Sequence, residues 1–259
     1  MAHNFLVWGI PVALILIFWL CLILGRKVGV VHVMNAVHPK AEIVGVAESA
    51  VFGLLALLIA FTFSGAYDRY ESRKMHLVDE ANVVEQAHNY TYLVPQNLQK
   101  ELRADMRQYL QHYVAAIENV PDDMVKVDQE LRAAAVLEEK IWSISVEAAN
   151  ELDNKAYAQV YLPAFNQMFE AAHTGYYLTQ IHPPQIIFLL LIILASLGAF
   201  LVGYNTAEHK QRYPLHSFCY VLLTAITIYI IINIEYPRVG FIGMPSFDKI
   251  LIDLRDNAD

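Results

Sequence analysis

The chain has 259 residues, of which 56% are apolar and 17% are charged. A soluble domain typically has about 25% charged and 45–50% apolar residues, so the composition excludes a disordered chain, a basic nucleic-acid-binding domain and a disulfide-rich secreted module. The net charge of −8 arises within residues 68–184, where 18 acidic residues oppose 10 basic ones. We therefore expect an integral membrane protein in which this segment is exposed to water.

About 20 apolar residues are needed to cross roughly 30 Å of hydrocarbon as a helix. Four stretches meet this requirement, at residues 5–24, 43–64, 185–203 and 215–234. The fold class that they predict is an all-α integral membrane protein with four transmembrane helices and a polar helical domain inserted between spans 2 and 3. Five basic residues flank the spans on one side and six on the other, so the positive-inside rule leaves the orientation open.

The predicted domain order follows from these spans. Residues 1–67 hold transmembrane helices 1 and 2, and residues 68–184 form the polar helical domain. Residues 185–236 hold transmembrane helices 3 and 4, and residues 237–259 form a tail with a short amphipathic helix. No proline interrupts the chain between residues 46 and 92, so we expect span 2 to continue into the polar domain as a single helix.

Apolar residues of the polar domain recur at helical spacing. Three such stripes run from Leu98 to Ile117, from Val127 to Ala148 and from Tyr157 to Phe169. Their expected role is packing between helices. Acidic residues at positions 122 and 123 indicate the start of a helix, because carboxylates favour the positive end of the helix dipole.

Glu48 is the one charged residue inside a predicted span. An ionisable group at this depth costs about 2.5–3.5 kcal/mol on insertion scales, so it normally faces protein or a water-filled cavity. On a helical wheel it shares one face with residues that we predict to line a pore together with it, namely Phe52, Leu55, Ile59, Thr62 and Phe63. A carboxylate ring would attract cations, and the apolar residues would form a neck. The alternative is that Glu48 lies near the membrane edge and pairs with Lys40 or His38.

Charges of both signs follow span 2 directly. We predict that Asp68, Arg69, Glu71 and Arg73 surround the vestibule of the pore, where they would concentrate ions. The alternative is a solvated helix with local ion pairs.

Motifs of enzymes and of metal sites are absent from the sequence. It contains no HExxH, GxSxG, P-loop, Rossmann glycine run or EF-hand loop. Cys21 and Cys219 both lie inside apolar runs, so the polar domain offers neither a disulfide nor a cysteine zinc site. We predict no catalytic site, no metal site and no cofactor.

Four runs of the sequence stand out, namely GLLALLIAFTFS at 53–64, RYESR at 69–73, DEAN at 79–82 and PRVGFI at 237–242. Together they resemble a bacterial membrane family described as bestrophin-like. Residues 61–74 are also similar to the run at the inner end of the pore helix of bacterial bestrophins, although Tyr70 and Glu71 stand where that run has tryptophans. Bestrophins are homopentameric ion channels with a pore lined by the second span, so this resemblance implies a cytosolic polar domain and ring assembly.

The predicted function is therefore a bestrophin-like homo-oligomeric ion channel of a bacterial inner (plasma) membrane. Its expected partners are further copies of the chain in a pentameric or tetrameric ring, the lipid bilayer and inorganic ions, but not nucleic acid. The alternative is a non-conducting membrane signalling or scaffold protein in which the long second helix acts as a lever.

Overall fold

The structure is a computed structural model that describes residues 2–35, 41–119, 123–207 and 214–237. Seven α-helices and one short 3-10 helix account for nearly all of these residues, and the described parts contain no strand. The prediction of an all-α protein is confirmed. The predicted tail helix lies within residues 238–259, which are outside the described ranges.

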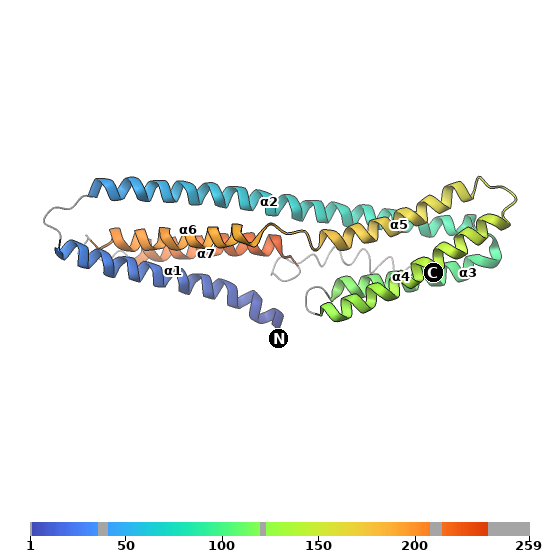
Figure 1. Ribbon diagram of the computed structural model, residues 1–259, viewed down its shortest axis with the longest axis horizontal. Helices are drawn as coiled ribbons and strands as arrows, with labels where there is room; N and C mark the ends of the chain where they lie inside the picture. Colours follow the sequence, from blue (N-terminus) through green and yellow to red (C-terminus); the bar gives the residue numbers. More distant parts are fainter. Residues whose placement is uncertain (1, 36–40, 120–122, 208–213, 238–259) are drawn as a thin grey trace. The chain divides into compact units, whose positions relative to one another are not determined.

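The chain divides into two compact units, and the boundary falls within the long helix α2, between Arg69 and Tyr70. The first unit contains α1 (Ala2–Asn35), the first part of α2 (Ala41–Tyr90), α6 (Gln185–Asn205) and α7 (Pro214–Glu235) (Figure 1). All four helices are long and apolar enough to cross a membrane, as the sequence predicts.

Helices α1, α6 and α7 pack against one another, and the contact between α1 and α6 is the most extensive. Gly203 of α6 lies against the backbone of Leu22, and Gly25 of α1 lies against the backbone of Phe200. A Cβ atom at either glycine would collide with this backbone, so the two helices can approach so closely only because the side chains are missing. Such small-residue contacts are typical of helix pairs in membranes, where van der Waals packing drives association.

The second unit contains the rest of α2, the 3-10 turn Thr91–Leu93, α3 (Gln96–Glu118), α4 (Met124–Glu151) and α5 (Ala158–Leu178). Its core is built from the three predicted stripes, with Leu102, Tyr109, Ile141 and Phe165 almost fully buried. Helix α4 begins where the acidic residues indicate, because the Asp123 side chain accepts a hydrogen bond of 3.0 Å from the Lys126 backbone N–H.

Helix α2 extends through residue 90 without a break, as the absence of proline predicts. It then gives way to the short 3-10 turn and to Val94 in an extended conformation. Residue 95 is a proline, and the residue before a proline is disfavoured in the helical conformation. The sequence therefore explains where this helix ends.

Candidate functional site

The face of α2 that the sequence predicts to line a pore turns toward the helices of its own chain. Leu55 is 5% exposed, and the Phe52 ring lies edge-on to Tyr220 of α7 with centroids 5.7 Å apart. Glu48 accepts a hydrogen bond from the side-chain amide of Asn205 at the end of α6. These side chains therefore have partners within the single chain.

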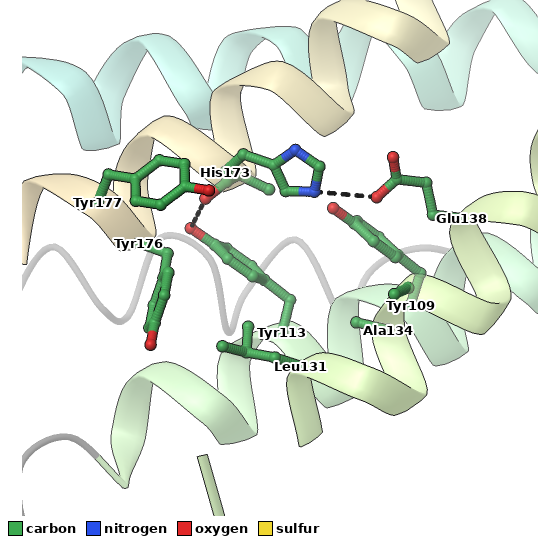
Figure 2. Close-up of a pocket in the computed structure, with 10 residues that line it drawn as sticks. Tyr109, Tyr113, Leu131, Ala134, Glu138, His173, Tyr176 and Tyr177 are labelled. Carbon is green, nitrogen blue, oxygen red and sulfur yellow. Dashed lines mark hydrogen bonds and ion pairs between the residues drawn. The ribbon is translucent and has the colours of Figure 1, made fainter. Parts of the chain in front are cut away.

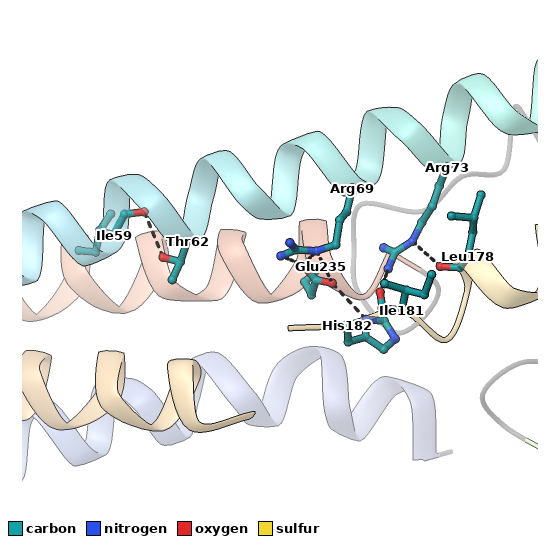
Figure 3. Close-up of polar contacts among 8 residues, drawn as sticks. All are labelled: Ile59, Thr62, Arg69, Arg73, Leu178, Ile181, His182 and Glu235. Carbon is teal, nitrogen blue, oxygen red and sulfur yellow. Dashed lines mark hydrogen bonds and ion pairs between the residues drawn. The ribbon is translucent and has the colours of Figure 1, made fainter. Parts of the chain in front are cut away.

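The remaining predicted pore residues differ in their surroundings. Ile59 and Thr62 are half-buried on the same face of α2. The Thr62 hydroxyl donates to the backbone carbonyls of Leu58, at 2.7 Å, and Ile59, at 3.1 Å (Figure 3), so its hydrogen is used within the helix. Phe63 is exposed. The pore-lining role of these six residues stays a prediction.

The opposite side of α2 carries a row of exposed residues, which we call the open row. Its members, spaced by three or four positions and therefore on one side of the helix, are Gly53, Leu57, Ala60, Ser64 and Asp68. Apart from the adjacent backbone of α2 itself, none of the described residues has an atom within 4 Å of the position of a Cβ atom at Gly53. Phe61, beside the open row, is 68% exposed.

Helix α2 is also the least covered of the four candidate spans. Only 11% of the residues in its most apolar window are buried, against 22% for α1, 39% for α6 and 44% for α7. The open row contains three small residues and ends in a carboxylate, whereas a lipid-facing helix surface is normally formed by large apolar side chains. Its composition suits close contact with another helix, or with water and ions.

Arg69 follows the open row and takes part in a buried ion-pair network within the first unit. Its guanidinium donates to both carboxylate oxygens of Glu235 at the end of α7, with distances of 2.6–3.1 Å. The Glu235 side chain has no exposed surface, and His182 Nδ1 lies 3.1 Å from its Oε1. Figure 3 shows Arg69 and His182 converging on the Glu235 carboxylate. The network ties α2 to α7 and to the residues that lead into α6.

Arg73, one turn further on, is bound within the second unit. It donates from Nε to the Leu178 carbonyl at 2.9 Å and from Nη2 to the Ile181 carbonyl at 2.8 Å (Figure 3). These carbonyls lie at and beyond the C-terminal end of α5, where backbone acceptors have no partner within a helix. Arg73 is 8% exposed, so it caps this end of α5 from a buried position.

The two acidic residues of the predicted vestibule remain at the surface. Asp68 is exposed, and Glu71 forms a half-exposed pair with Lys74 at 3.4 Å. Of the four vestibule residues, the structure therefore leaves the two acidic side chains at the surface. It places both arginines in contacts inside the chain. The vestibule role of all four stays a prediction.

Glu235 and His182 did not emerge from the sequence as site residues. Glu235 stands at the end of the fourth span, where a carboxylate is ordinarily read as the polar boundary of a membrane helix. Its partner Arg69 is 166 positions away. The available signal was the presence of opposite charges at the ends of two different spans, which is too common to identify a pair.

The Bestrophin-like domain family matches residues 12–244 of the chain. The chain belongs to the bestrophin-like family. No curated protein sequence matches it. Among solved structures, the bestrophin-like chain is similar to two variants of a bacterial bestrophin homolog from Klebsiella pneumoniae. The first variant aligns with a TM-score of 0.67 and 12% identity, and the alignment covers 96% of this chain and 98% of the other. The second variant aligns with a TM-score of 0.68 and 11% identity, and the alignment covers 95% of this chain and 98% of the other.

A third solved structure, described as a membrane protein, has a TM-score of 0.67 and 12% identity, with 94% of this chain and 98% of the other covered. At these identities the likeness establishes the fold. The bestrophin-like chain therefore shares its fold with the bacterial homolog over almost the whole length of both chains.

Proposed function

We propose that several copies of this bestrophin-like chain form an ion channel in the bacterial inner membrane, with α2 of each copy beside the pore. In this arrangement the open row faces the pore, and Asp68 of each copy contributes to a ring of carboxylates at its end. The polar unit lies on the cytosolic side. The observation that carries the proposal is the exposure of the open row in a chain whose other three spans cover one another.

The chemistry of the open row favours a pore surface over a lipid surface. Large apolar side chains can face lipid without cost, so the exposure of Leu57 and Phe61 fits either environment. Ser64 ends the apolar span in the same row, and Asp68 follows one turn further on, where its carboxylate would meet water at the mouth of the pore. Leu57 and Phe61 would then form an apolar constriction that can gate by dewetting, and Asp68 would attract cations.

The face predicted from the sequence is the competing pore surface. It would place Glu48 in the ion path and Phe52, Leu55, Ile59 and Phe63 at the neck. Glu48 and Phe52 contact α6 and α7 of the same chain and Leu55 is buried within it, so we assign this face to packing. The two assignments differ in which carboxylate controls selectivity.

The test is the reversal potential of the purified protein in a planar bilayer under asymmetric KCl. We expect a current that reverses near the potassium potential. In Asp68→Asn the reversal potential should move toward zero, because the ring loses its negative charge. Glu48→Gln should leave the reversal potential unchanged.

Glu147→Gln serves as the matched control, because it removes one negative charge from an exposed position of α4. An unchanged reversal potential in Asp68→Asn, combined with a shift in Glu48→Gln, would transfer the pore to the predicted face. Absence of current from folded, oligomeric protein would overturn the channel and favour the signalling scaffold. The continuity of α2 from the membrane unit into the polar unit is the feature that supports this second candidate.

A further inference from the structure

A pocket of about 200 Å³ lies between α3, α4 and α5 of the polar unit (Figure 2). Four tyrosines line it, Tyr109 and Tyr113 from α3 and Tyr176 and Tyr177 from α5, together with Glu138 from α4. A cavity of about 150 Å³ accommodates benzene, so this space fits a small organic group. The pocket takes no part in the channel proposed above.

Small side chains keep the pocket open. Ala134 and Ala135 of α4 and Ala172 of α5 stand at positions where a larger residue would fill the space. Helix α4 packs extensively on α3 and much less on α5. The cavity therefore lies where α4 and α5 are separated, with the four tyrosines between them.

The polar groups of the pocket are arranged so that some remain available to a ligand. The Tyr113 hydroxyl donates to the Ala172 carbonyl at 3.0 Å, which fixes that ring. The Tyr109 hydroxyl has no hydrogen-bond partner among the described residues, although the residue is 2% exposed. Figure 2 shows this hydroxyl pointing toward the pair formed by His173 and Glu138.

Glu138 is paired through one of its carboxylate oxygens with His173, which also lines the pocket. His173 Nε2 lies 3.0 Å from Oε2, and the other oxygen has no partner within the described parts of the chain. The pKa of the Tyr109 hydroxyl is raised far above its usual value, first by burial and then by the negative charges of Glu138 and Glu80. The pocket thus combines a phenol that stays protonated, a carboxylate and several aromatic rings.

We propose that this pocket binds a small organic cation, an alkylammonium or quaternary ammonium ion. Tyrosine rings attract such cations through the negative charge of their faces. The Glu138 carboxylate supplies the counter-charge, and the apolar side chains of the lining, such as Leu131 and Ala134, contact the alkyl groups. An inorganic cation is a poorer fit, because it requires several oxygen ligands and the pocket offers one carboxylate and phenolic hydroxyls.

The test uses the full-length protein in detergent, titrated calorimetrically with choline, with tetramethylammonium and with 3,3-dimethyl-1-butanol, the uncharged isostere of choline. We expect both cations to bind. Choline should bind about tenfold more tightly than the alcohol, because only the charged ligand is attracted by the tyrosine rings and by the carboxylate. Equal affinity for choline and its isostere, or absence of binding by both cations, would overturn the proposal.

Two variants locate the site. Glu138→Gln should weaken choline binding about tenfold and leave the affinity for the alcohol unchanged. Glu139→Gln is the matched control, because the neighbouring carboxylate is exposed and absent from the pocket lining. Tyr176→Leu removes an aromatic face from a half-buried position and should also weaken choline binding. Choline affinity that is unchanged in Glu138→Gln, with the thermal unfolding midpoint preserved, would contradict the assignment.

Discussion

Asp68, Arg69 and Arg73 belong to one short run of charges, yet their surroundings differ completely. Asp68 is exposed at the end of the open row, Arg69 is paired with a fully buried carboxylate, and Arg73 caps the end of α5. One turn of helix separates the two arginines, so both lie on the side of α2 opposite the open row. The arginines therefore stabilise the chain itself, and Asp68 is available to ions.

Replacing Arg69 should destabilise the protein strongly. Arg69→Met leaves the Glu235 carboxylate buried without its main partner, and breaking a buried pair in this way typically costs about 3–5 kcal/mol. We expect a clear fall in the thermal unfolding midpoint in detergent. Adding Glu235→Leu should recover much of the loss, because the uncompensated charge is removed as well.

The control for this prediction is Arg132→Met. Arg132 also pairs with a carboxylate, Asp128, at 2.9 Å, but both side chains are largely exposed. An exposed pair contributes about 0–1 kcal/mol, so the unfolding midpoint should hardly change. Equal losses in Arg69→Met and Arg132→Met would contradict a stabilising role for the buried network.

At the scale of elements, the glycines of the spans have two different roles. Gly25 and Gly203 allow the backbones of α1 and α6 to come together, whereas Gly53 on α2 faces open space. The same residue type therefore marks a tight helix–helix contact in one place and an uncovered surface in another.

Alanine substitutions should separate these roles. Gly203→Ala places a methyl group against the Leu22 backbone, and overpacking of this kind typically costs about 1–3 kcal/mol. Gly53→Ala meets no atom within 4 Å and should not lower the unfolding midpoint, since alanine also favours the helix. Thermal unfolding of both variants checks the prediction. A loss in Gly53→Ala equal to that in Gly203→Ala would show that α2 is already covered at this position.

At the scale of the whole molecule, a single chain leaves one side of its second span uncovered. In the proposed ring, the open row of each copy faces the pore, so that Ser64 and Asp68 meet water there. The chain is therefore suited to association with further copies of itself through or around α2.

Purified protein should be oligomeric by light scattering with the detergent contribution subtracted. In a background of Cys21→Ser and Cys219→Ser, Ala60→Cys on the open row should form disulfide-linked dimers under oxidation. Leu55→Cys on the packed face should not, because that position is buried within its own chain. A strictly monomeric protein would overturn both the ring and the channel, because one copy of four helices cannot enclose such a pore.

Much of the fold could be predicted from local patterns. Four apolar blocks predicted the spans, and helical stripes such as Leu98 to Ile117 predicted the core of the polar unit. The absence of proline predicted the length of α2. These features depend on neighbours within a few turns, so periodicity and residue type are sufficient to find them.

The orientation of α2 about its own axis could not be predicted from the sequence. A helical wheel shows that Glu48, Phe52 and Leu55 share a face, but it contains nothing to say whether that face meets a pore or another helix. The partners that decide this, Asn205 and Tyr220, lie more than 150 positions along the chain. The pairing of Arg69 with the buried Glu235 likewise depends on packing between distant elements, as does the pocket that four tyrosines line together with Glu138.

The sequence by itself therefore determined which segments are helical, which of them are apolar enough to span a membrane, and the family to which the chain is similar. Only the tertiary structure decided which charges are paired inside the chain and which side of α2 remains open. The physical reason is that helix formation and hydrophobicity are properties of a segment, whereas exposure is a property of everything packed around it.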